Sequence, residues 1–91
     1  MLTASERRAL KARAHKLEPV VRIGAKGLTG EVVAEIDRAL KAHELIKVRA
    51  GTLERDERSS VVEEICGRTG AAQVQSVGKI FVLFRKNDEQ A

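Results

Sequence analysis

The sequence contains very few of the residues on which several common kinds of site depend. Its 91 residues include one cysteine, one proline, two phenylalanines, no tyrosine and no tryptophan. Cys66 has no partner for an internal disulfide, and neither histidine has a cysteine or carboxylate at metal-ligand spacing. With Phe81 and Phe84 as the only aromatic residues, a sheet that stacks successive bases is poorly supplied. We therefore expect no metal and no cofactor, and any nucleic acid should be bound mainly through its backbone.

Long apolar runs are also absent. No segment approaches the roughly 18 apolar residues of a membrane-spanning helix, and the chain begins with a charged segment rather than an apolar signal sequence. Together with the single cysteine, this predicts a cytoplasmic protein without membrane contact. A hydrophobic content of 43% still supports a folded chain, and the length suffices for one modest core.

Positive charge is concentrated at the start of the chain. Residues 1–30 contain seven lysines and arginines and only two glutamates, whereas the rest of the chain is nearly neutral. A basic half of this kind is the electrostatic footprint of a nucleic-acid binder, although a solvated helix face gives the same pattern. The basic residues are Arg7, Arg8, Lys11, Arg13, Lys16, Arg22 and Lys26.

Residues 20–29 predict a short strand, a glycine-bracketed turn and the start of a helix. Gly24 and Gly27 enclose Ala25 and Lys26. Glycine permits positive φ and lets another backbone approach closely, while the first turn of the helix supplies free N–H groups and a partial positive charge. Since Lys26 adds a full charge at the tip, the arrangement favours a phosphate ligand.

The glycine spacing differs from two better-known motifs. A P-loop has four residues between its glycines and then Lys-Ser/Thr, whereas here two residues intervene and Leu28 follows Gly27. A dinucleotide fingerprint needs Gly-x-Gly-x-x-Gly and an acid after the second strand, and both are missing. KH-type domains use a Gly-x-x-Gly turn to clamp a nucleic-acid backbone, but the same tetrapeptide also serves as an ordinary turn before a helix.

Local signals predict seven elements in the order α-β-α-β-α-β-β. Residues 3–6 have the form of a capping box, and Leu10, Ala14 and Leu17 form the predicted buried stripe of the first helix. Pro19 should end that helix. Strands are expected at residues 20–23, 45–49, 74–77 and 80–85, with further helices from Thr29 to about His43 and from beyond residue 57 to Gly70.

These elements predict an α/β fold, with one four-stranded mixed sheet and packed helices. The unbroken apolar run Ile80–Phe84 favours an interior strand. Lys47 and Arg49 share one face of the second strand, and that face is expected to be open. Residues 1–86 should form a single domain and residues 87–91 a disordered tail. The strand order does not follow from the sequence.

Four of these features occur in the same order in one known family. They are the Gly24–Thr29 loop, the His43–Val48 junction, the Thr69-Gly70 helix end and the Val77–Lys79 hairpin. Over roughly residues 3–86 the chain resembles the CRM domain family, and in particular its single-domain bacterial YhbY-like members. The resemblance implies an RNA-binding fold similar to the C-terminal domain of translation initiation factor 3. It also implies a role with precursors of the large ribosomal subunit, with which the single-domain bacterial members are associated. Related plant domains serve group II intron splicing but occur several to a chain, so a one-domain chain speaks against that role.

The resemblance further implies that the glycine loop and nearby basic residues contact RNA. Family loops often carry more polarity or charge than Ala25-Lys26, which shifts part of the expected affinity to the first helix. We therefore predict a protein that contacts ribosomal RNA during large-subunit maturation. The candidate RNA-binding residues are Gly24, Ala25, Lys26, Gly27, Arg22, Arg7, Arg8, Lys11, Lys47 and Arg49.

No residue pattern indicates an enzyme. Cys66 has the pattern of a core thiol without a neighbouring base, and His15 and His43 are placed to interact with helix dipoles. Two other functions stay open. One is a protein-interaction module on the ribosome, with an exposed apolar residue such as Leu45 or Phe81, and the other is a small nucleotide-binding domain that uses the same glycine loop.

Overall fold

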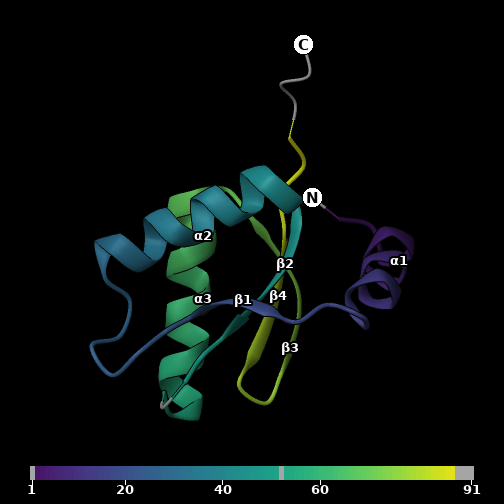
Figure 1. Cartoon of the computed structure of the whole chain (residues 1–91). Helices are drawn as coiled ribbons and strands as arrows, with labels where there is room; N and C mark the ends of the chain where they lie inside the picture. Colours follow the sequence, from purple (N-terminus) through teal and green to yellow (C-terminus); the bar gives the residue numbers. More distant parts are fainter. Residues whose placement is uncertain (1, 52, 88–91) are drawn as a thin grey trace.

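The computed structural model describes residues 2–51 and 53–87. It contains the seven elements in the predicted order (Figure 1), which confirms the α/β class. The boundaries differ from expectation by one to a few residues, and the largest differences are at the end of the first helix and at the starts of the third helix and the third strand. The elements are α1 (Ala4–Ala14), β1 (Pro19–Arg22), α2 (Gly30–His43), β2 (Leu45–Arg49), α3 (Arg55–Thr69), β3 (Ala72–Val77) and β4 (Ile80–Phe84).

The four strands form one mixed sheet in the order β1-β2-β4-β3. The β1–β2 pair is parallel, and β4 is antiparallel to both of its neighbours, β2 and β3. Phe81, Val82 and Leu83 of this interior strand are all buried, because helices cover it on both faces, as the unbroken apolar run predicted. This leaves β1 and β3 as the two edge strands.

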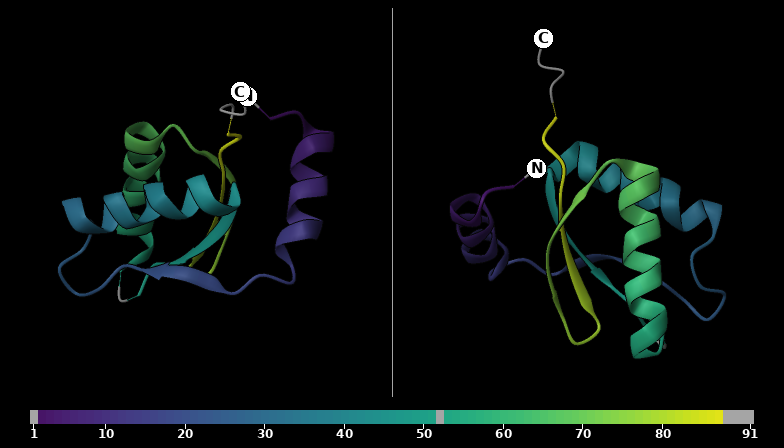
Figure 2. Two further views of the ribbon diagram at one scale, coloured as in Figure 1. Left: turned by 45° about the horizontal axis from the view of Figure 1, so that its top comes forward. Right: turned by 180° about the vertical axis from the view of Figure 1, so that it is seen from behind.

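The helices cover the two faces of the sheet unequally. α2 and α3 lie together on one face, and α1 lies alone on the other (Figures 1 and 2). The larger core lies under α2 and α3 and includes Ile36, Leu40, Ile65 and Phe81. The smaller core, under α1, consists of Leu10, Ala14, Leu45, Val74 and Val82. One short helix cannot cover four strands, so part of the α1 face of the sheet is open.

The first helix begins as predicted and ends earlier. The hydroxyl of Thr3 accepts a hydrogen bond from the Glu6 amide at 3.0 Å, and the Glu6 carboxylate accepts one from the Thr3 amide at 2.8 Å. This capping box holds the pKa of Glu6 below its ordinary value. The helix stops at Ala14, and Leu17 in the following linker is 37% exposed. The predicted burial of Leu17 is therefore wrong, because the chain has left the helix before that residue.

The second helix follows the prediction at both ends. The Thr29 hydroxyl accepts a hydrogen bond from the Val32 amide at 3.2 Å, and the helix runs to His43. Its C-cap residue, Glu44, has φ +63, which is uncommon for a residue other than glycine.

Within the described residues, no helix is long and apolar enough to span a membrane.

Arg85, directly after β4, ties α2 and α3 together. Its guanidinium donates to the Asp37 carboxylate at 2.6 Å and to the Thr69 carbonyl oxygen at 2.7 Å. The side chain is 19% exposed. Because Asp37 belongs to α2 and Thr69 ends α3, one side chain fixes both helices to the end of the sheet.

Asn87 extends this anchoring past the sheet. Its amide donates to the Glu44 carboxylate at 3.0 Å, and its side chain donates to the Lys41 carbonyl oxygen at 2.8 Å. Asn87, which we expected to begin the tail, is therefore held at the end of α2. Residues 88–91, the rest of the expected tail, lie outside the described residues.

Candidate nucleic-acid interface

The loop between β1 and α2 is a tight turn with an open outer surface. The Gly27 amide donates to the Gly24 carbonyl oxygen at 3.0 Å, which closes the turn. Gly27 has φ +77, whereas Gly24 adopts a conformation open to any residue. A Cβ added to either glycine would meet nothing within 4 Å. Another molecule can therefore reach the backbone of the turn, at whose tip Ala25 and Lys26 are exposed.

Gly51, which the sequence analysis did not select, fixes the base of this loop. It has φ +68, and a Cβ there would collide with the carbonyl oxygen of Ile23. The Ile23 amide in turn donates to the Arg49 carbonyl oxygen at 2.9 Å. Ile23 directly precedes Gly24, so this close approach determines where the loop leaves the sheet. A glycine after a strand is too common in turns to have indicated this role from the sequence.

Basic side chains continue from the loop onto the open face of the sheet. Arg22 lies beside Arg49 in the register of β1 and β2, and Lys47 lies two residues before Arg49 on the same face. The alternate residues Val21 and Val48 are buried in the core under α2 and α3. Arg22, Lys47 and Arg49 therefore face the α1 side, as predicted for Lys47 and Arg49.

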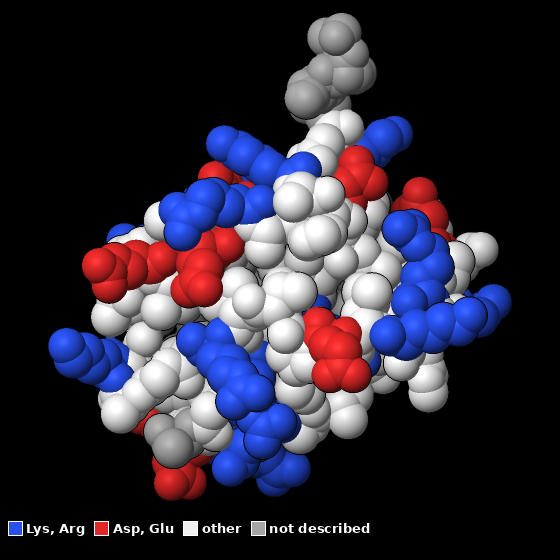
Figure 3. Space-filling model, in the orientation of Figure 1, with Lys and Arg blue, Asp and Glu red and all other residues white. Residues whose placement is uncertain are grey.

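The first helix adds a further cation to this face. Lys11 and Lys47 line one hollow of about 360 Å³ between α1 and the sheet. Figure 3 shows Lys and Arg side chains over the β1–α2 loop, along the nearby lower edge of the molecule and over α1. The row from α1 to the loop, here called the basic track, consists of Lys11, Lys47, Arg49, Arg22 and Lys26.

The basic track has no acidic partner within residues 2–51 and 53–87. The ion pairs there are Lys41–Asp37, Arg68–Glu64 and Arg85–Asp37. Four cations of the track are exposed and Lys47 is half-buried. These charges are therefore free to meet an anionic ligand.

Arg7 and Arg8, which the sequence analysis also selected, differ in their surroundings. Arg7 donates from Nη1 to the carbonyl oxygens of Gln73 at 2.5 Å and Val74 at 3.3 Å, and so holds α1 to β3. Arg8 is exposed and shares a shallow hollow with Arg7 and Lys11. The structure thus brings eight of the ten candidates into the loop and the adjoining track, leaves Arg8 beside it, and gives Arg7 a structural contact.

The residues considered for other functions are poorly placed for them. Leu45 and Phe81 are 5% and 0% exposed, so the prediction that one of them forms an exposed apolar patch is wrong, because both pack in the cores. Burial raises the pKa of the Cys66 thiol, which opposes an activated thiolate. The described residues contain no group of three His, Cys, Asp or Glu side chains that could hold a metal ion.

Comparison with known proteins identifies the family of the chain. The CRS1 / YhbY (CRM) domain model matches residues 2–85. The chain is 44% identical over 88 residues to a Haemophilus influenzae protein named as an RNA-binding protein, covering 97% of this chain and 89% of that one. A Pseudomonas aeruginosa protein, also named for RNA binding, is 42% identical over 86 residues, covering 94% and 83%.

A solved structure extends the comparison to the fold. The solution structure of a hypothetical protein of Staphylococcus aureus, thought to bind RNA, superposes with a TM-score of 0.86 at 31% identity. The match covers 100% of this chain and 95% of that one. The resemblance seen in the sequence is therefore confirmed, and the chain belongs to the CRS1 / YhbY (CRM) domain family.

Proposed function

We propose that the protein binds RNA through the phosphate backbone, with the Gly24–Gly27 turn and the basic track as the contact surface. The observation that carries the proposal is the row of cations without acidic partners that ends at an open glycine turn. The names of the H. influenzae and P. aeruginosa relatives support RNA as the ligand. Binding is the whole of the proposed activity, and no catalytic step is assigned.

The turn and the track would make different contacts. At the turn, the absence of side chains at Gly24 and Gly27 lets a phosphate approach the main chain, and Lys26 adds charge. Along the track, Arg22 and Arg49 stand on neighbouring strands about 5 Å apart, and Lys47 is about 7 Å from Arg49 along β2. Cations at these spacings can reach different phosphates of one RNA segment.

The proposed target is ribosomal RNA during maturation of the large subunit. This part of the proposal rests on the bacterial single-domain members that the chain resembles. The small aromatic content supports a backbone-directed contact, which suits a structured RNA recognised by shape. A single base-reading platform on the sheet is not part of the proposal.

Binding to transcripts of large-subunit and small-subunit ribosomal RNA, measured over a range of salt concentrations, tests both parts. Counterion release contributes a log-log slope of roughly −0.7 to −0.9 per phosphate, so five cations should give about −4. Affinity should also be higher for the large-subunit transcript. A flat salt dependence would contradict phosphate binding and favour a protein-interaction module. Equal affinity for both transcripts would contradict the proposed target alone.

A further inference from the structure

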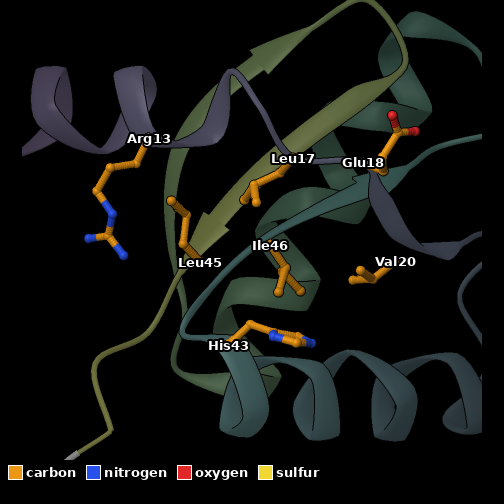
Figure 4. A pocket seen from close by; sticks show the side chains of 7 residues that line it. All are labelled: Arg13, Leu17, Glu18, Val20, His43, Leu45 and Ile46. Carbon is orange, nitrogen blue, oxygen red and sulfur yellow. The ribbon is translucent and has the colours of Figure 1, made fainter.

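A second hollow lies at the beginning of β1, where the α1–β1 linker, β2 and the end of α2 meet (Figure 4). Its volume is about 350 Å³. That is near the lower end of the roughly 300–1,000 Å³ of small-molecule sites, so it suits one compact group rather than a long ligand. Its lining residues are Arg13, Leu17, Glu18, Val20, His43, Leu45 and Ile46.

The hollow exists because β1 does not run the full length of β2. The pairing of β1 with β2 begins at Lys47, so Leu45 and Ile46 have no strand beside them on this edge. The first residue of β1 is Pro19, which has no N–H to donate. β1 therefore leaves this edge of β2 unpaired, although Leu45 and Ile46 themselves are only 5% and 1% exposed.

The floor of the hollow is apolar and open to solvent. Leu17 is 37% exposed and Val20 is 46% exposed. Within the described part of the chain these are two of the three large apolar side chains that are exposed, the third being Val77. Figure 4 shows Leu17, Val20 and Ile46 around one space. Exposed apolar side chains gathered within a polar rim mark a binding site more often than scattered ones do.

Two planar side chains, Arg13 from α1 and His43 from the end of α2, stand at the rim (Figure 4). Arginine and histidine are among the side chains on which unpaired RNA bases stack. Both residues are exposed, so each is accessible to a ligand that enters from solvent. The rim thus offers two flat surfaces beside an apolar floor, and it carries the negative charge of Glu18 as well as the positive charge of Arg13.

The hollow and the proposed RNA contact share strand β1. From Val20, at the hollow, β1 leads to Arg22 of the basic track and then to Gly24 at the turn. The separation from Val20 to Gly24 is about 13 Å at 3.3 Å per residue, which about four stacked nucleotides would span. A segment of RNA held by its phosphates at the turn can therefore reach the hollow.

We infer that the hollow receives one unpaired base of the RNA that the turn and the basic track hold. The inference rests on the proposed RNA binding and adds a preference to it. An extruded base would bury one face against Leu17 and Val20 and stack on Arg13 or His43. The protein should therefore prefer RNA with a bulged base to the same RNA fully paired.

Two RNA hairpins that differ only by a single-nucleotide bulge provide the test, with wild type, Val20→Gln and Lys26→Ala. Wild type should bind the bulged hairpin about tenfold more tightly, the factor expected for one stacked base. Val20→Gln places a polar side chain in the hollow and should abolish this preference while affinity for the paired hairpin is unchanged. Lys26→Ala should weaken binding to both hairpins by the same factor.

The outcomes separate the two proposals. If wild type shows no bulge preference, or Val20→Gln keeps it, the inference is overturned, and a protein segment becomes the better occupant of the hollow. If Lys26→Ala leaves both affinities unchanged, the proposed function fails instead. A bulge that carries 2-aminopurine gives a second readout on the wild-type protein. Its fluorescence should change to saturation on binding, and an unchanged signal would also overturn the inference.

Discussion

Two regions of the molecule use basic residues in opposite ways. Between α2 and the end of α3, Arg85 is 19% exposed and donates hydrogen bonds to Asp37 and the Thr69 carbonyl oxygen. Along the basic track, on the other hand, Arg22 and Arg49 lie side by side and exposed, without an acidic partner in the described residues. The fold thus supplies a partner for Arg85 and, among the described residues, supplies none for Arg22 and Arg49.

Gly51 and Gly24 differ in the same way, since a neighbour constrains the first and none constrains the second. Alanine variants of these two glycines should show the largest difference in stability. Gly51→Ala forces a Cβ against the Ile23 carbonyl oxygen at positive φ, and should cost about 3 kcal/mol of unfolding free energy. Gly24→Ala meets no neighbour within 4 Å and should change stability by less than about 1 kcal/mol. Urea denaturation measures both.

The RNA affinities of these variants sharpen the contrast. Gly24→Ala should weaken binding, because its Cβ stands where a phosphate would approach the turn. Equal stability of the two variants would contradict the assigned role of Gly51. Unchanged RNA affinity of Gly24→Ala would show that the ligand does not approach the backbone there.

Removal of the Arg85 side chain should lower the stability of the fold and leave RNA binding intact. Arg85→Ala leaves the Thr69 carbonyl oxygen and the Asp37 carboxylate without their donor, and should cost about 2 kcal/mol. That would lower the melting temperature by roughly 10 °C in a domain of this size. RNA affinity measured well below the melting temperature should stay the same.

Arg68→Ala is the control for Arg85→Ala. Arg68 pairs with Glu64 at 3.4 Å between two half-exposed side chains, so its loss should cost less than about 0.5 kcal/mol. If the two variants melt alike, the buried network around Arg85 does not stabilise the fold as described.

Removal of two cations of the basic track should weaken RNA binding and slightly raise the stability of the fold. Arg22→Ala combined with Arg49→Ala should flatten the log-log salt slope of RNA binding by about 1.5. The same pair of changes removes two like charges that face each other across β1 and β2, so stability should rise by a few tenths of a kcal/mol. A fall in stability with an unchanged salt slope would place these arginines in the structural group.

Acid should produce a small effect on stability through Asp37. Hydrogen bonding from Arg85 holds the pKa of Asp37 below its ordinary value of 3.8. A carboxylate with a lowered folded-state pKa stabilises the fold above the unfolded value, and this contribution is lost as the pH falls through the folded value. Asp37→Asn should therefore cost less than about 1 kcal/mol at pH 7.

Denaturation of wild type and Asp37→Asn between pH 7 and pH 2 checks this sign. The stability difference should stay constant down to about pH 5 and then shrink below pH 4 as Asp37 takes up a proton. A difference that grows toward acid pH would contradict the assigned contact.

Much of the fold could be predicted because its signals are local. The capping box at Thr3, the Thr29 cap, the Gly70 helix end and the apolar run of β4 each depend on residues within one element. Leu17 misled the prediction because a helical period continues in the sequence past the point at which the helix ends. The strand order depends on contacts between distant segments and has no local signal.

The parts of the candidate site that have a local sequence pattern could be predicted. The Gly24–Gly27 turn has a recognisable spacing, and the alternation of β2 put Lys47 and Arg49 on one face. Arg7 could not be told from its exposed neighbours, because its acceptors are 66 and 67 residues away in the chain. Gly51 was missed for the same reason, since its constraint comes from the carbonyl oxygen of Ile23.

Binding of RNA to Lys26→Ala tests the central claim most directly, with Arg38→Ala as the matched control. Arg38 is also an exposed cation, but it lies on the outer side of α2, opposite the buried Ile36 and Leu40. Both variants should melt like wild type, because exposed charges contribute little to stability. Lys26→Ala should bind RNA several-fold more weakly than Arg38→Ala. Equal affinities at equal melting temperatures would contradict the account, and would leave the glycine turn a connection between β1 and α2 and nothing more.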